Sequence, residues 1–247
     1  MSFDGVIPGM AGKVLLLLLI GELILSQGSL ASAPNLLDLS TVKEGDQLRL
    51  IDDEPDGMLG DWEGSVNAGL GFKVLDKSQW TPIHTNGELA LMTDLRKKTW
   101  PVSLAVDLLY SRSQMYLYTG NDAYRAKTGF GDFEIPAHVL MDLRVETCEL
   151  ALGVRKTWLS FDTVRPFVGG GLDLAWVKGE LNTEEAGRSN IGRGAGFWVA
   201  GGMNLIFNEY LNFAFESRYS RVETDMSLGP PAQIGGLHYH FILGGNW

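Results

Sequence analysis

The sequence is poor in three features that would assign it to a common class. One cysteine, Cys148, is present in 247 residues, which excludes an intrachain disulfide and a cysteine-rich zinc site. Lys and Arg number 20 against 30 Asp and Glu. This acidic balance argues against a nucleic acid as partner, because phosphate binding needs clustered basic residues. No apolar run is long enough for a membrane-spanning helix, which needs about 20 residues.

The residues that are present exclude a disordered chain. Hydrophobic residues make up 45% of the sequence, and glycines number 31, which is too apolar a composition for intrinsic disorder. The mean hydropathy of +0.02 resembles that of a soluble protein. An average of this kind hides how apolar residues are arranged along the chain, so the arrangement has to decide the class.

Residues 1–31 have the pattern of a secretory signal peptide. Lys13 precedes the apolar run 14–20, and a stretch of small residues follows. A basic segment, a short apolar segment and a small-residue cleavage site define such signals. We expect cleavage after Ala31, because a cut after Ala33 would be hindered by the proline that follows. An amphipathic core helix, the alternative, would need a polar face that the run lacks.

Residues 32–59 are predicted to form a polar periplasmic linker with an acidic cluster. Four acidic residues occupy positions 1, 3, 5 and 12 of a calcium loop: Asp52, Glu54, Asp56 and Glu63. Glutamate at position 3, proline at position 4 and a strand in place of the following helix do not fit that loop. A solvated acidic linker is the preferred interpretation, and we assign neither a metal nor a cofactor.

From residue 60 onward the hydrophobic pattern has a period of two. Even positions from Trp62 to Val74 are apolar or glycine, while the odd positions are small or polar. This alternation is typical of a strand with one apolar face. The same pattern predicts eight strands, which lie near 62–74, 88–95, 100–111, 149–155, 168–176, 197–207, 211–219 and 237–247.

The connections and the aromatic residues predict how these strands close. Short connections alternate with long ones, which is the signature of an outer-membrane barrel. Aromatic residues gather at the strand ends, where amphipathic rings favour the membrane interface. Those at the short-turn ends are Trp62, Trp100, Trp158, Phe207, Tyr210 and Trp247, and those toward the long-loop ends are Tyr110, Trp176, Tyr219 and Tyr239.

We therefore predict an all-β fold over 60–247, a transmembrane antiparallel up-and-down β-barrel of eight strands. A soluble barrel of the lipocalin type is the alternative, with the apolar face inside. The non-apolar face disfavours it, because that face is rich in Gly, Ala, Ser and Asn and poor in the Lys and Glu that a water-facing surface uses.

With this strand pattern the chain resembles a known superfamily. The residues that carry the resemblance are the alternating strands, Trp100-Pro101-Val102-Ser103-Leu104, the segment 149–155 and the closing segment 237–247. They are similar to the eight-stranded outer-membrane barrels that include OmpA-like, OmpX/Ail-like and OmpW-like proteins. The resemblance implies a place in the bacterial outer membrane, with its lipids and lipopolysaccharide as partners.

The resemblance also implies that the last strand is read by the barrel assembly machinery. In that superfamily the strand ends in an aromatic residue, usually Phe, where this chain has Trp. The residues of this sequence that match the signal are Tyr239, Phe241, Leu243 and Trp247.

An eight-stranded barrel is just wide enough to be filled by side chains. The inward parity carries mostly acidic residues with a few basic ones and two histidines: Glu63, Lys73, Glu88, Asp94, Asp107, Glu149, Arg155, Asp173, Glu216, Arg218, His238 and His240. Charges in such an interior must be paired or hydrated. We expect an ionic network that closes the lumen. A narrow, weakly cation-preferring, porin-like channel is the alternative.

Two expectations concern strand pairing. Pairing of Val222 with Gly236 would place Arg218 beside His240 in the last hairpin. In the segment 139–152 the apolar residues move from odd to even positions between 145 and 150, which predicts a bulge or a break.

The segment 113–146 is expected to form a β-hairpin that protrudes from the membrane, with its tip near 119–134. Exposed strand edges can recruit a partner by strand addition, so this hairpin is a candidate for an extracellular partner. A ten-stranded barrel that contains this stretch as an extra membrane hairpin is the alternative.

Enzymatic motifs are weak. His138 and Asp142 lie close in sequence, but no serine follows nearby. His238 and His240 share one strand face and could bind a metal, but no third ligand is identified by spacing. The sequence therefore favours a structural or surface-interaction, adhesion-like role over that of a lipid A-modifying enzyme, and we assign no catalytic residue.

Overall fold

The computed structural model describes residues 61–77, 79–80, 83–128, 131–159, 163–183, 187–208, 210–226 and 231–247. The predicted signal peptide, its cleavage site and the linker with Asp52, Glu54 and Asp56 lie outside these residues. No helix in the described ranges is long and apolar enough to cross a membrane.

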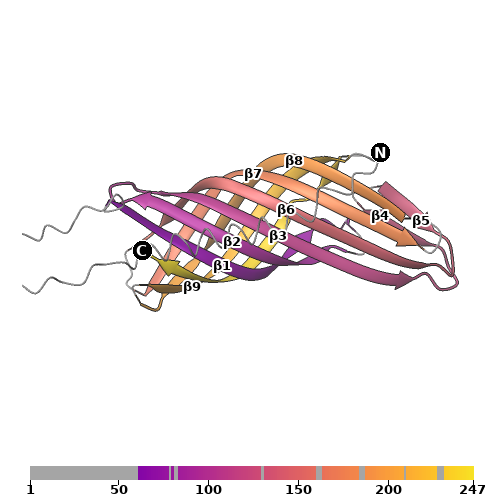
Figure 1. The fold of residues 1–247 in the computed structure, drawn as a ribbon, viewed down its shortest axis with the longest axis horizontal. Helices are drawn as coiled ribbons and strands as arrows, with labels where there is room; N and C mark the ends of the chain where they lie inside the picture. Colours follow the sequence, from indigo (N-terminus) through magenta and orange to yellow (C-terminus); the bar gives the residue numbers. More distant parts are fainter. Residues whose placement is uncertain are drawn as a thin grey trace, which may run out of the picture. The chain divides into compact units, whose positions relative to one another are not determined.

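Eight long strands form a closed antiparallel barrel (Figure 1). They are β1 (Trp62–Leu75), β2 (Thr85–Lys97), β3 (Ser103–Tyr118), β6 (Leu140–Thr157), β7 (Val164–Thr183), β8 (Gly187–Ile206), β9 (Leu211–Met226) and β11 (Gly236–Asn246). Neighbours in sequence are neighbours in the barrel, and the pairing of β1 with β11 closes it. The prediction of an eight-stranded up-and-down barrel is confirmed.

The connection between β3 and β6 contains a separate two-stranded hairpin, β4 (Tyr124–Thr128) and β5 (Gly131–Ile135). These strands pair only with each other in the described sheets, so the ten-stranded alternative is wrong. A further short strand, β10 (Ala232–Gln233), pairs with β9 just before β11 begins.

The register of the last hairpin differs from the prediction by two residues. His238 lies opposite Arg218, and His240 lies opposite Glu216, so the expected pairing of Val222 with Gly236 is wrong. The physical reason is that β10 already pairs with β9, from Ala232 opposite Thr224, and this contact fixes the register of the whole hairpin. A shift of two residues leaves every side chain on its predicted face.

Strand β6 runs without a bulge. It pairs with β3 in one register from Leu140 opposite Tyr118 to Arg155 opposite Ser103. The predicted bulge or break between 145 and 150 is therefore wrong. What changes along β6 is the surroundings of each face, because the inward side chains become apolar and the outward ones become charged as the strand approaches the long loops.

The outer surface shows where this change occurs. On the side of the short turns, large apolar side chains are exposed around the barrel, among them Leu70, Leu152, Leu172, Val199 and Phe241. An exposed apolar belt of this extent requires lipid around it. The belt ends on each strand between two successive outward residues, an uncharged one on the belt and a charged one beyond it. These pairs are Tyr110 and Arg112 on β3, Cys148 and Glu146 on β6, Trp176 and Lys178 on β7, and Tyr219 and Arg221 on β9.

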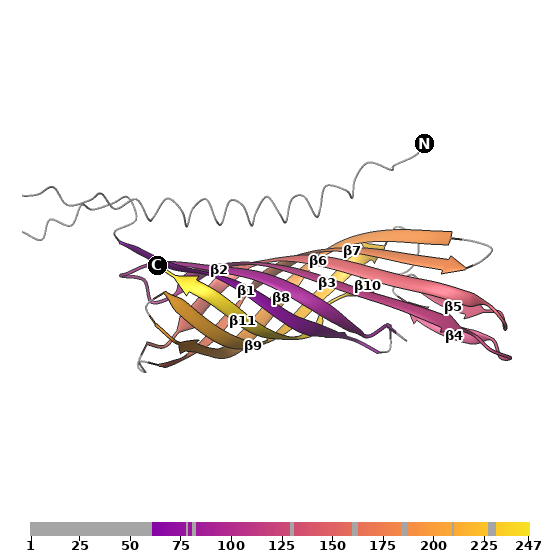
Figure 2. The ribbon, with the colours of Figure 1, turned by 60° about the horizontal axis from the view of Figure 1, so that its bottom comes forward.

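Beyond this boundary four strands continue as a sheet that we call the extension. It consists of Ser113–Tyr118, Leu140–Val145, Lys178–Thr183 and Gly187–Ile191. Figure 2 shows β3, β6, β7 and β8 passing the ends of β1, β2 and β11. The predicted protruding hairpin is thus present, as part of a wider sheet.

The inner face of the extension has an apolar core of its own, which we call the cap. Two connections pack against this face, one through Trp80 and Ile83 and the other through Ala232 and Ile234. They are also joined to each other, because the Trp80 indole donates a hydrogen bond of 2.7 Å to the Gln233 carbonyl. The Gln233 amide donates in turn to the Gln79 side chain at 2.8 Å. The buried residues of the cap are Leu75, Trp80, Ile83, Ile135, Met141, Leu143, Val145, Ala175, Val177, Leu181, Val222, Met226, Ala232 and Ile234.

Candidate functional site

The lumen beneath the cap is filled by a buried polar network. Its upper part joins β1, β6, β2 and β11. The Lys73 ammonium forms an ion pair with Glu149. Glu88 Oε1 lies 2.8 Å from His238 Nδ1 and 2.6 Å from His240 Nε2. All five side chains are fully or almost fully buried.

The lower part of the network is built on two arginines. Arg218 donates to Asp107 and, at 2.9 Å, to Glu216. Arg155 donates to Asp107 at 3.1 Å, to Glu216 at 3.3 Å and to Asp94 at 2.6 Å. Each of the two central carboxylates therefore serves both guanidinium groups, which fixes the geometry of all four side chains.

The two parts meet at His240, whose Nδ1 lies 3.6 Å from Glu216 Oε1. Asp173 is also fully buried, and its carboxyl group interacts with that of Glu149 in the upper part. Glu63 lies elsewhere, at the short-turn rim, where it accepts a hydrogen bond of 2.5 Å from Arg96.

Carboxylates outnumber the Lys and Arg side chains in the buried network. Five carboxylates and three Lys or Arg residues are buried: Glu88, Asp107, Glu149, Asp173 and Glu216 against Lys73, Arg155 and Arg218. With the carboxylates ionised and both histidines neutral, two negative charges are left over. Uncompensated charge is costly in such an interior. The two imidazoles lie beside two of these carboxylates, Glu88 and Glu216.

Trp198 is a lumen residue that the sequence reasoning missed. Its ring is fully buried, and the ring centroid lies 4.4 Å from the guanidinium carbon of Arg218. This is a cation–π contact. Glycine on β6, the second strand from β8, makes room, since a Cβ on Gly153 would lie 2.8 Å from the ring. The available signal was that Trp198 is the one large residue among small ones on its parity, from 192 to 202.

Ser220 is a second residue that was missed. Its hydroxyl lies 2.9 Å from His238 Nε2, and the other nitrogen of that ring faces Glu88. The contacts from Ser220 through His238 to Glu88 follow the order of a hydrolase triad. All three side chains have almost no exposed surface, so a substrate would have no room beside the hydroxyl. The arrangement fixes the orientation of the His238 ring.

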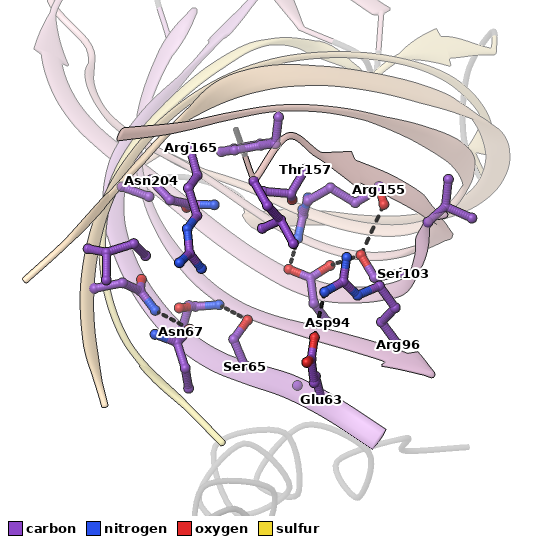
Figure 3. Close-up of a pocket in the computed structure, with 18 of the residues that line it drawn as sticks. Glu63, Ser65, Asn67, Asp94, Arg96, Ser103, Arg155, Thr157, Arg165 and Asn204 are labelled. Atoms are coloured by element: carbon purple, nitrogen blue, oxygen red, sulfur yellow. Dashed lines mark hydrogen bonds and ion pairs between the residues drawn. The ribbon is translucent and has the colours of Figure 1, made fainter. Parts of the chain in front are cut away.

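The short-turn end of the lumen opens into a cavity of about 590 Å³, which we call the vestibule. Figure 3 shows Arg155, Arg165 and Asn204 around it, with Asp94 held by Arg155. The vestibule ends at Arg155 and Glu216, and these belong to the network. From the short-turn end to the long loops the barrel therefore holds a vestibule, an ionic network and an apolar cap.

The structure does not bring together the loop residues considered for catalysis. His138 Nδ1 lies 3.2 Å from the Tyr118 hydroxyl. Asp142 instead accepts hydrogen bonds from Gln114, at 3.0 and 3.2 Å.

The aromatic residues expected at the membrane interfaces lie outside the lumen, exposed or half-buried, on strands or in the adjoining turns. Trp62 and Trp100 pack edge to face, with ring centroids 5.6 Å apart. The others are Tyr110, Trp158, Trp176, Phe207, Tyr210, Tyr219, Tyr239 and Trp247. In the last strand, Phe241 and Leu243 share the outward face with Tyr239.

No protein-family model matches the chain. No curated protein matches it by sequence. Solved structures do match. Ail, the attachment invasion locus protein of Yersinia pestis, is 10% identical, with 76% of this chain and 99% of Ail covered and a TM-score of 0.51.

Two further matches are more distant in structure. Neisserial surface protein A is 9% identical over 75% of this chain and 96% of its own, with a TM-score of 0.41. A major outer membrane protein of Thermus thermophilus is 13% identical over 75% and 98%, with a TM-score of 0.43. The likeness to Ail, together with the closed ring of eight antiparallel strands, establishes that the chain has the fold of the eight-stranded outer-membrane β-barrels.

Proposed function

We propose that this protein is an integral barrel of the bacterial outer membrane, with a closed lumen and a surface-interaction role carried by the extension. The observation that carries the proposal is the change of polarity on β6. Leu150 and Leu152 face outward on the belt, whereas Arg144 and Glu146 face outward on the extension. A strand with this pattern suits lipid along one part of its length and water along the other.

The proposed orientation follows from the connections. In outer-membrane barrels the short turns face the periplasm and the long loops face the outside, so the extension would project from the cell and the vestibule would face the periplasm. The predicted signal peptide supports export. The apolar belt would contact outer-membrane lipid and lipopolysaccharide.

A closed lumen is supported by two successive barriers, the ionic network and the cap. The vestibule favours the alternative, a narrow channel, because it offers a polar entrance with Arg165 and Asn204 on its wall. It ends at Arg155 and Glu216, both buried in the network. Planar-bilayer recording of the refolded protein decides between the two. We expect no discrete conductance steps, and reproducible steps would establish the channel.

A surface-interaction role is supported by the outer face of the extension. Tyr116 and Tyr118 are exposed there, and beyond Arg112 the described part of β3 has no pairing with β2, which leaves a strand edge for a partner. Three basic residues on or beside this face are paired with acids, Arg112 with Glu146, and Arg144 and Lys178 with Glu180. The Ail structure contains a heparin analogue, but paired charges of this kind do not favour a polyanion here.

The role can be tested with cells that display the protein. Cells with the wild-type chain should adhere to immobilised extracellular-matrix proteins more than cells with the empty vector. The double variant Tyr116→Ser, Tyr118→Ser should lose most of that difference, while Trp158→Ser at the short-turn end should keep it. Equal adhesion of wild-type and vector cells to all coatings would leave only a structural role.

A further inference from the structure

We propose that the lumen binds one Zn²⁺ ion through Glu88, His238 and His240. The two histidines lie on one face of β11, and the structure adds a carboxylate from β2 that spacing in the sequence did not reveal. One ligand atom from each residue lies within 4.8 Å of the others, and all three side chains are buried. The proposal goes beyond the surface role and does not depend on it.

The donor set and its spacing suit zinc. Two imidazole nitrogens and a carboxylate oxygen are ligands that Zn²⁺ takes at about 2.0–2.2 Å, in tetrahedral sites that leave a fourth position for water. Ligand atoms at those lengths are separated by roughly 3.3 Å. Glu88 Oε1 now lies 2.8 and 2.6 Å from the two nitrogens, so small side-chain movements open the site.

The groups behind the histidines are those that a zinc site uses. A zinc-bound imidazole characteristically donates its other ring N–H to an oxygen acceptor, which holds the ring in place. Behind His238, Nε2 lies 2.9 Å from the Ser220 hydroxyl. Behind His240, Nδ1 lies 3.6 Å from Glu216 Oε1.

One buried atom of the cluster points independently to a missing ligand. Glu88 Oε2 has no hydrogen-bond partner among the described residues. Buried polar atoms are rarely left in that state. A metal bound by Glu88 Oε2 would give this oxygen the partner that it lacks.

The charge of the lumen fits a divalent cation. With its carboxylates ionised, the buried network has two negative charges in excess when both imidazoles are neutral, which is the state in which they bind metal. A divalent cation at this site would offset negative charge among these carboxylates. Two cations of the network already have ion-pair partners, Lys73 in Glu149 and Arg218 in Asp107 and Glu216.

The vestibule supplies the route. Glu216 lines it, and its Oε1 lies 3.6 Å from His240 Nδ1, so only side chains of the network separate the vestibule from the site. The cap blocks the other end with apolar side chains. Zinc would therefore reach the site from the periplasmic side in the orientation proposed above.

The test uses the full chain refolded in detergent micelles and dialysed against Zn²⁺, with Mg²⁺ as the competing ion. We expect one Zn²⁺ per chain by elemental analysis and no displacement by Mg²⁺. His240→Asn should lose stoichiometric binding, whereas the matched variant His138→Asn, outside the lumen, should keep it. Zn²⁺ retained by the double variant His238→Asn, His240→Asn, or absent from the wild type, would overturn the proposal.

A second measurement keeps the test decisive if the ligand variants do not fold. Co²⁺ bound to the wild type should give the intense visible absorption of a tetrahedral site, and weak octahedral absorption would contradict the assignment. Ser220→Ala, which removes only the support of His238, should weaken Zn²⁺ binding about 10–100-fold. Ser103→Ala, which removes a lumen hydroxyl near the short-turn end, should leave it unchanged.

Discussion

Two carboxylates hold Arg218, and the Trp198 ring covers its guanidinium group. Such a side chain has no access to water that could replace a lost partner. Removing one partner of a buried pair is costly because it leaves the other charge uncompensated, although the complete pair contributes little beyond what apolar packing would. The lumen network is therefore fragile toward single substitutions.

Asp107→Ala should lower the free energy of unfolding by about 3–5 kcal/mol, because both Arg155 and Arg218 lose a buried partner. Urea titration in detergent micelles, followed by tryptophan fluorescence, measures the change. Glu63→Ala is the matched control, since its partner Arg96 lies at the exposed rim, and a pair of that kind is worth about 0–1 kcal/mol. Equal losses in the two variants would contradict this account of the network.

At the scale of the element, β6 reverses the polarity of its two faces along its length. Below the boundary its inward residues are polar, such as Glu149, and its outward ones are apolar, such as Leu152. Above the boundary Leu143 faces inward and Arg144 outward. The same hydrogen-bonded ladder supports both arrangements because side-chain orientation depends on parity alone.

Leu143→Ala should destabilise the extension without opening the barrel. Loss of a fully buried leucine from an apolar core costs about 2–5 kcal/mol, so amides of β6 from Leu140 to Val145 should exchange faster with deuterium by the corresponding factor. Amides near Leu152 should keep their protection. Arg144→Ala, on the opposite face of the same strand, is the control and should change neither region.

The strands and their inward faces were predictable because strict alternation occurs within each strand. The pairing of β9 with β11 was not, since a period of two gives the same faces when the register moves by two residues. The predicted bulge in β6 came from assuming one environment along the strand, whereas Val145 and Leu150 are apolar in different surroundings. In the lumen, the charged residues were found by parity, while Trp198 and Ser220 were passed over because neither is charged.

The geometry of the lumen could not be read from the chain either. Glu88 is separated from His240 by 152 residues, and only the closure of the barrel brings β2 and β11 to opposite sides of β1. A cluster made by ring closure leaves no spacing motif in the sequence.

At the scale of the whole molecule, the belt and the extension divide the outer surface. Leu172 is 67% exposed and Tyr116 is 68% exposed, but the first lies on the belt and the second beyond the boundary. An arginine at the bilayer midplane of a barrel costs about 2–4 kcal/mol, and the cost falls toward zero near the interface.

Leu172→Arg should therefore destabilise the protein by about 2–4 kcal/mol in phospholipid vesicles, while Tyr116→Arg should cost less than about 1 kcal/mol. Reversible guanidinium unfolding from vesicles compares the two. Similar costs at both sites would mean that the lipid boundary does not lie between them.

Ring closure predicts a role for Trp247. Its amide and carbonyl exchange hydrogen bonds of 3.1 and 3.2 Å with Gly64, and its ring lies where a Cβ of Gly64 would stand. We expect Trp247→Ala to slow insertion into vesicles that contain the barrel assembly machinery several-fold, whereas Trp247→Phe should insert at the wild-type rate. Phe207→Ala, an exposed aromatic at the same end, controls for general loss of interfacial contacts. Wild-type rates for Trp247→Ala would remove the assembly signal from this position.

The reversal of polarity along β6 also fixes the depth of the protein. If the barrel moved deeper by two residues, which is about 6–7 Å along a strand, Arg112 and Glu146 would enter the hydrocarbon. Rising by the same step would lift Leu150 and its neighbours into water. Both displacements should be opposed, so we expect the barrel to keep one vertical position in the membrane, with the extension outside the lipid.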